Sequence, residues 1–184
     1  ALSYGGLIMT HNVSALIFSP FVVVYGLLRG VSARVMRSTW LALIGGLLVS
    51  FALSAWFWLP ALGEANLVQL DNQTTGYFNY VEHFRAANLI QTSIGFDYSI
   101  TADPQSSTPF AMGLVQAIGT GAGLIVLIAT WRRARDRSFR GFVVVGLIVS
   151  TLMITPLSKV LWDTLPLLPL TQFPWRFLSI QAVF

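Results

Sequence analysis

Residues 39–62 read TWLALIGGLLVSFALSAWFWLPAL, an apolar run without a charged side chain. A helix needs about 20 apolar residues to cross the hydrocarbon core of a bilayer, so this run predicts a transmembrane helix. The pair Gly45–Gly46 favours close contact with a neighbouring helix, and Trp56 and Trp58 are typical of the headgroup region. The fold class then depends on whether the rest of the chain repeats this pattern.

The composition of the whole chain agrees with a membrane protein. Of the 184 residues, 55% are hydrophobic and 10% are charged, whereas a typical soluble domain carries about 25% charged residues. We therefore predict an all-α, polytopic transmembrane helix bundle. The expected spans are residues 12–29, 39–62, 110–131 and 141–157, with partial helices at 1–10 and 175–184. Because both ends lie in apolar runs, we expect residues 1–184 to form a single membrane domain, an internal fragment of a longer chain.

Two polar features set the expected topology. Eight of the eleven Lys and Arg residues lie in the short linkers 29–38 and 132–140. Basic residues accumulate in cytoplasmic loops, so both linkers should be cytoplasmic and residues 63–109 should form an extracytoplasmic loop of about fifty residues. Basic clusters between apolar runs indicate membrane topology rather than a nucleic-acid-binding surface, so no nucleic-acid partner is expected. The prolines between 156 and 174 predict an interfacial or re-entrant segment in place of a regular helix.

Arg176 is the most specific candidate for ligand binding. It follows Gln172-Phe173-Pro174-Trp175 at the expected external start of a helix. A guanidinium binds phosphate oxygens with a planar fork, so Arg176 is a candidate for a lipid-phosphate contact. The alternative is an arginine that reaches toward the lipid headgroups without a specific ligand.

His11 and Asn12 are a second candidate, at the external end of the first expected span. Polar residues at that depth favour a role in a binding cavity. The alternative is that Asn12 caps the helix and His11 lies at the interface. With two histidines and no cysteine in the chain, we predict no metal site and identify no cofactor.

The external loop supplies further candidates. Residues 77–85 read YFNYVEHFR, where aromatic rings alternate with groups that suit sugar or headgroup contacts. The alternative is a loop that folds onto the membrane surface. The candidate contacts are Glu64, Tyr80, Glu82, His83 and Arg85. Lys159 and Asp163 are spaced by four residues, which predicts an ion pair.

Four stretches together carry a resemblance to a known family. They are THNVSALIF at 10–18, WFWLPAL at 56–62, YFNYVEHF at 77–84 and PLSKVLWDTLPLLPLTQFPWRFL at 156–178. The most specific are Met9-Thr10-His11-Asn12 and Gln172-Phe173-Pro174-Trp175-Arg176-Phe177. This pattern resembles a class of large bacterial membrane proteins of Chloroflexi-like genomes, which are similar to C-type (GT-C) glycosyltransferases.

The resemblance implies a function at the outer face of the bacterial plasma (inner) membrane. The donor would be a polyprenyl-phosphate-linked sugar, and membrane lipid would be the other partner. Arg176 and His11 would line the cavity. The catalytic acid would lie in a first external loop that these residues do not include, so the catalytic residues are unknown. Whether the full-length enzyme uses a divalent metal is left open.

Two other functions fit the sequence. Glycine-rich spans and interfacial aromatic residues would equally suit a non-catalytic transmembrane subunit of a bioenergetic or photosynthetic complex. Broken helices at His11–Asn12 and at 156–174 favour a transporter or flippase. The spans contain almost no ionisable residues for a coupling path, which counts against transport. Part of a membrane glycosyltransferase is the leading hypothesis.

Overall fold

The computed structural model describes residues 1–32, 34, 36–64, 67, 75–92, 94–95, 110–134 and 136–184. The chain divides into two compact units, unit 1 at Ala1–Asp71 and unit 2 at Asn72–Phe184. Within the described residues the regular structure is helical and no strand occurs, which confirms the all-α prediction. An isolated parallel bridge pairs Ile90 with Met112. Much of the predicted external loop 63–109 lies outside the described residues.

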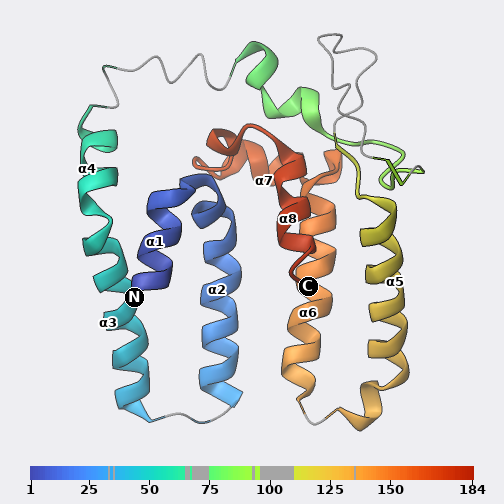
Figure 1. The fold of residues 1–184 in the computed structure, drawn as a ribbon, viewed down its shortest axis with the longest axis horizontal. Coiled ribbons are helices and arrows are strands. Elements are labelled where there is room, and N and C mark those ends of the chain that lie inside the picture. The colour runs from blue at the N-terminus through green and yellow to red at the C-terminus, as the bar shows by residue number, and fades with distance from the viewer. Residues whose placement is uncertain are drawn as a thin grey trace. The chain divides into compact units, whose positions relative to one another are not determined.

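The described residues of unit 1 form the helices α1 (Leu2–Thr10), α2 (Asn12–Ser32), α3 (Arg37–Leu53) and α4 (Ala55–Gly63). Helix α1 packs against both α2 and α3 (Figure 1). A Cβ added at Gly5 would lie 3.2 Å from the carbonyl oxygen of Ser50, so a glycine permits this close approach. On the α2 side, the hydroxyls of Tyr4 and Ser19 form a hydrogen bond. The His11–Asn12 break is therefore a tight turn between two packed helices.

Helix α2 is the one described helix that is long and apolar enough to cross a membrane by itself. The predicted span 39–62 is not one straight helix, because α3 and α4 meet at an angle of 61°. The Ser54 hydroxyl donates to the carbonyls of Ser50 and Phe51, both at 3.0 Å. Such bonds back onto the preceding turn bend helices, and they account for the break at this position.

Unit 2 combines short and long helices. They are η3 (Gly76–Phe78), η4 (Tyr80–His83), α5 (Leu114–Ala129), η5 (Trp131–Arg133), α6 (Arg137–Met153), η6 (Pro156–Ser158), α7 (Lys159–Thr164), η7 (Pro169–Thr171), η8 (Pro174–Arg176) and α8 (Phe177–Gln181). Helix α8 packs along α6 (Figure 1). The buried amide of Gln181 joins three helices, because it donates to the Thr151 hydroxyl at 2.6 Å and accepts from Gln116 at 3.1 Å.

The predicted spans in unit 2 have different boundaries in the structure. Helix α5 has 16 residues and starts at Leu114 rather than 110, because the Met112 backbone pairs with Leu89 and Gln91. Helix α6 starts at Arg137 rather than 141, because the Asp136 carboxylate caps it by accepting from the Phe139 amide at 2.9 Å. It ends at Met153, and the helical run that starts at Pro156 is bent from it by 95°.

The described residues thus contain one helix of spanning length and composition, or three if each bent pair crosses as one span. A helix or a bent helix pair lies at each of the four predicted spans, but the described residues do not confirm four separate spans. At the interface of α5 and α6, Arg140 donates to the Leu127 carbonyl at 3.2 Å and to the Thr130 hydroxyl at 2.6 Å. This basic residue therefore satisfies the last turn of α5.

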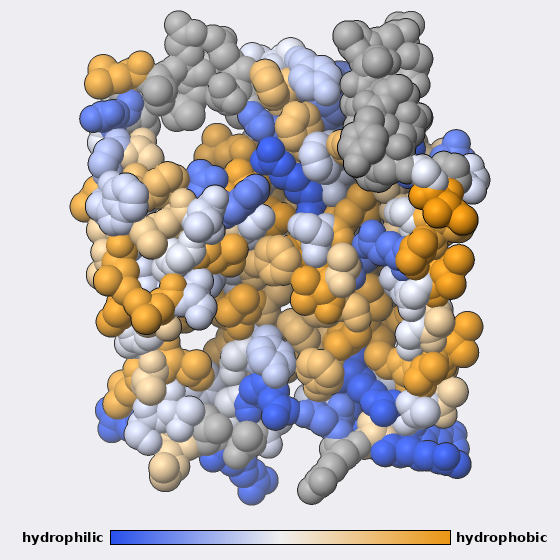
Figure 2. All heavy atoms as spheres, in the orientation of Figure 1, coloured by the Kyte–Doolittle hydropathy of each residue, from blue (hydrophilic) through white to orange (hydrophobic). Residues whose placement is uncertain are grey.

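Burial in both units differs from that of a soluble protein, because small polar side chains are buried while many large apolar ones are exposed. Ser50, Ser54 and Ser150 are fully buried, and each hydroxyl bonds to a carbonyl of the preceding helical turn. Large apolar side chains such as Ile118 and Ile125 of α5 are exposed. Figure 2 shows hydrophobic side chains over much of the α5 surface and hydrophilic ones at its lower end. This distribution suits helices surrounded by hydrocarbon.

Candidate functional site

The structure brings together two of the predicted site segments, residues 77–85 and 172–176, both in unit 2. Helix η4, from the first segment, contacts η8, from the second. The centre of this contact is Phe173, a residue that sequence analysis did not single out. The other candidates, His11, Asn12 and Glu64, belong to unit 1.

Five rings form a cluster around Phe173, which we call the Phe173 cluster: Tyr77, Phe78, His83, Phe173 and Trp175. The His83 ring meets the Phe173 ring edge-on with centroids 4.8 Å apart, and Trp175 stacks on Phe173 at 5.2 Å. Tyr77 and Phe78 each lie at 6.2 Å from it. Tyr77 and Phe78 are also exposed, so part of the aromatic surface of this cluster is accessible to a ligand.

Arg176 lies against the Phe173 cluster. Its Cζ atom is 5.2 Å from the centroid of the Phe173 ring, a cation–π distance. Its Nη1 atom donates to the Thr171 carbonyl at 2.9 Å. The side chain is half-buried, and no described acidic residue forms an ion pair with it. A guanidinium has five N–H donors, so most of its donors have no acceptor within the described part of the chain.

The backbone beside this arginine is strained. Gln172 adopts φ 63° and ψ −50°, although it is not a glycine. This conformation turns the chain between the Thr171 carbonyl, which accepts from Arg176, and the Phe173 ring. A residue in a sparsely populated conformation persists where its surroundings hold it, and such residues are concentrated at binding sites.

Tyr80 links the loop to helix α7. Its hydroxyl donates to Asp163 Oδ1 at 2.5 Å, and its ring stacks on Trp162 with centroids 5.2 Å apart. The hydrogen bond with Asp163, followed by burial and the nearby negative charge, raises the pKa of Tyr80 to about 12. Lys159 Nζ lies 2.7 Å from Asp163, so the predicted ion pair is confirmed. Tyr80 is therefore a neutral hydrogen-bond donor at physiological pH.

Arg85 and Glu82 occupy different surroundings from each other. Arg85 is only 7% exposed, and its Nη1 donates to the Asn88 carbonyl at 3.0 Å. Its backbone amide donates to the Ile154 carbonyl at 2.9 Å. Burial lowers the pKa of the Arg85 guanidinium. Arg85 thus holds the loop onto the end of α6 rather than reaching outward. Glu82 is exposed and forms no ion pair with a described residue.

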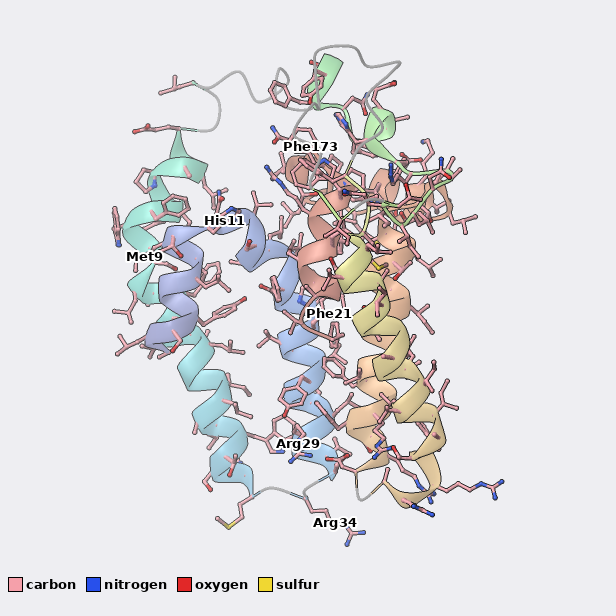
Figure 3. All side chains as sticks on the ribbon, turned by 45° about the vertical axis from the view of Figure 1, so that its right-hand side comes forward. Met9, His11, Phe21, Arg29, Arg34 and Phe173 are labelled. Carbon is pink, nitrogen blue, oxygen red and sulfur yellow. The ribbon has the colours of Figure 1, made fainter. Side chains whose placement is uncertain are left out.

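In unit 1, His11 rather than Asn12 caps helix α2. His11 Nδ1 accepts from the Ser14 amide at 3.2 Å, and Figure 3 shows His11 at the turn that precedes α2. Asn12 Oδ1 accepts only from the adjacent Val13 amide, at 2.8 Å. Arg29 and Arg34 lie at the opposite end of α2 (Figure 3). Glu64 is exposed at the end of α4.

No family model, curated protein or solved structure matches this chain. The described residues contain no group of three or more His, Cys, Asp or Glu side chains placed to hold a metal ion. The chemistry available at this site is therefore that of Arg176, the Phe173 cluster and Tyr80.

Proposed function

We propose that this chain is part of a polytopic bacterial plasma-membrane protein that binds a polyprenyl-phosphate-linked sugar and takes part in its transfer at the outer face. The observation that carries the proposal is Arg176, a half-buried cation beside an aromatic cluster with no acidic partner among the described residues. The GT-C resemblance of the sequence points in the same direction.

An anionic ligand accounts for the environment of Arg176. A guanidinium stays charged in proteins, and burying a charge without a partner is costly. Phosphate oxygens match its free donors and would offset that cost. The exposed rings of Tyr77 and Phe78 offer apolar faces for a sugar beside that phosphate. Together they fit a ligand with one anionic group and one ring.

Membrane location is supported by three observations. Helix α2 has 21 residues and is long and apolar enough to span a membrane. Each of the two bent helix pairs is long and apolar enough when its two helices are taken as one span. Exposed apolar side chains and buried serines are the pattern expected in hydrocarbon. The arginines of linkers 29–38 and 132–140 support a cytoplasmic position for both linkers.

In the proposed reaction, an acceptor hydroxyl oxygen attacks the anomeric carbon of the sugar. The bond from that carbon to the phosphate oxygen breaks, and the lipid phosphate leaves with one additional negative charge. Arg176 stabilises this charge as it develops. A carboxylate from another part of the full-length protein takes the hydroxyl proton. The Tyr80 hydroxyl donates to Asp163, and this bond holds helix η4 in place. Because His83 belongs to η4, the same bond positions the His83 ring at the site.

The test compares Arg176→Gln with Arg132→Gln in the full-length protein in lipid nanodiscs. Arg132 is an exposed arginine of the same unit and serves as the matched control. Loss of a charge-assisted contact should weaken binding of a polyprenyl phosphate on the order of 10- to 100-fold, and transfer should fall with it. Arg176→Lys should recover part of the affinity, because it keeps the charge without the fork.

If Arg176→Gln binds polyprenyl phosphate as the unchanged protein does, the proposal is wrong. The non-catalytic subunit would then be the better explanation, particularly if the protein is isolated in fixed stoichiometry with other membrane proteins and shows no turnover.

A further inference from the structure

The helical run 156–164, which comprises η6 and α7, has two opposite faces. Trp162 and Ser158 are buried on one face, and Trp162 is 0% exposed. Leu157, Val160 and Leu161 have the spacing of one helix stripe and point away from that buried face. Leu157 is 80% and Val160 69% exposed. The run therefore presents an apolar stripe that no described residue covers.

The direction of this run follows from helix α6. The two are bent by 95° relative to each other. Helix α6 has 17 residues, which corresponds to about 25 Å at the rise of an α-helix. The hydrocarbon core of a bilayer is about 30 Å thick. If α6 crosses the bilayer, the run that follows it begins near the core boundary and lies nearly parallel to the membrane surface.

The charged residues of the run are confined to its flank. Lys159 and Asp163 form their ion pair there, and Asp163 also accepts from Tyr80 of η4. The loop segment that carries Tyr80 therefore contacts the charged flank, which stays exposed, and leaves the apolar stripe free. Beyond α7, Leu165 and Leu167 are also exposed and extend the apolar surface.

We infer that the stripe of Leu157, Val160 and Leu161 lies in the outer leaflet, at the boundary between lipid headgroups and acyl chains. Amphipathic helices that lie in the interface bury their apolar face about 5–10 Å below the headgroups. The occupant of this surface is membrane lipid. The inference rests on the membrane location proposed above but not on the proposed substrate.

This placement also sets the depth of the candidate site. The Trp162 ring contacts Tyr80 of η4 and, at a centroid distance of 6.0 Å, Phe177, which directly follows Arg176. His83 of the same η4 helix contacts Phe173. A helix α7 anchored in the interface would therefore hold Arg176 close to the headgroups, where the phosphate of a lipid-linked ligand is found.

The experiment measures depth with single cysteines, since these 184 residues contain none. Leu161→Cys is labelled with an environment-sensitive fluorophore in the full-length protein, with any other cysteines replaced by serine. The protein is reconstituted into vesicles of phosphatidylcholine and phosphatidylglycerol. Quenching is compared for spin-labelled lipids with the label near the headgroup, spin-labelled lipids with the label near the chain end, and aqueous iodide.

We expect Leu161→Cys to be quenched about twofold more by the shallow lipid label than by the deep one, and weakly by iodide. Two matched controls define the quenching expected in water and in the hydrocarbon core. Glu82→Cys, exposed in the polar loop, should respond to iodide alone, and Ile125→Cys, exposed on α5, should respond to the deep label. Val160→Cys repeats the measurement on the same stripe in case Leu161→Cys does not fold.

Three outcomes would overturn the inference. Iodide quenching at Leu161→Cys equal to that at Glu82→Cys would place α7 in water. Protection from all quenchers would indicate that protein covers the stripe. Dominant quenching by the deep label would make α7 a re-entrant segment. If Ile125→Cys also escapes the lipid labels, the membrane location itself fails, which separates the two proposals.

Discussion

In unit 1 two close helix contacts are made at glycines, whereas in unit 2 the candidate site is held together by large aromatic rings around Trp162. Gly5 meets the Ser50 backbone, and Gly30 meets the ring of Trp40. In unit 2, Trp162 is enclosed by Tyr80, Phe84 and Phe177. Small residues permit backbone approach between helices, while aromatic clusters join short segments whose backbones do not run alongside each other. The candidate ligand site is of the second kind.

The largest expected effect is the loss of the aromatic centre of unit 2. Trp162→Ala should lower the free energy of unfolding by about 3–5 kcal/mol, because it leaves a cavity under both η4 and α8. Trp56→Ala is the control, since Trp56 is 71% exposed. Denaturant unfolding in detergent micelles measures both. Equal losses for the two variants would show that the rings around Trp162 do not hold unit 2 together.

The corresponding test of unit 1 adds a methyl group rather than removing a ring. A Cβ at Gly30 would lie 2.1 Å from the Trp40 ring, so Gly30→Ala should cost about 1–3 kcal/mol through overpacking. Gly26→Ala, on the same helix, has no atom within 4 Å of the added Cβ. It should be neutral or slightly stabilising. If Gly30→Ala is tolerated as well as Gly26→Ala, the close contact between Gly30 and the Trp40 ring does not help to order unit 1.

Tyr80→Phe separates the hydrogen bond of unit 2 from its ring packing. The ring stays on Trp162 while the bond to Asp163 is lost, so we expect a loss of about 1–2 kcal/mol at neutral pH. The pKa of Tyr80 is raised from 10.0 to about 12 in the folded protein. Its contribution to stability is therefore fully present below pH 10 and is lost as the pH rises toward 12.

The measurement is a spectrophotometric titration of tyrosinate. The difference between the unchanged protein and Tyr80→Phe should be one tyrosine that titrates near pH 12. A tyrosine that titrates at its ordinary pKa would contradict the short bond to Asp163.

The smallest expected effect concerns the exposed ion pair on the flank of α7. Lys159→Gln removes the pair but leaves the Tyr80–Asp163 hydrogen bond. Exposed pairs contribute little to stability, so the free energy of unfolding should not change measurably. The same unfolding assay applies, with Tyr80→Phe as the reference. A loss as large as that of Tyr80→Phe would mean that the cation, rather than the phenol, orders this contact.

Local patterns predicted part of this arrangement. The spacing of Lys159 and Asp163 predicted their ion pair, and the apolar run after Asn12 predicted helix α2. Hydropathy reports how long an apolar run is but not the direction of its axis. The 61° bend at Ser54, made by a side chain that bonds to its own helix, was therefore missed.

The site was predicted residue by residue but not as an arrangement. Tyr80, His83 and Arg176 were each candidates. They are brought close to one another by contacts of Tyr80 with Trp162 and of His83 with Phe173, residues that lie about eighty to ninety positions apart in the sequence. Single-sequence periodicity carries no information on such contacts. Arg85 was expected to face a ligand, but an arginine that reaches outward and one that is buried against carbonyls have the same sequence signature.

The contact of Arg140 with the last turn of α5 has a consequence for biosynthesis. Helix α5 has 16 residues and α6 has 17, so each is marginal as an independent membrane insertion unit. Arg140 of α6 donates to the Leu127 carbonyl and to the Thr130 hydroxyl, so its guanidinium finds both partners within the hairpin. If the two helices enter a membrane, this contact suits their insertion together, as a hairpin that one arginine closes.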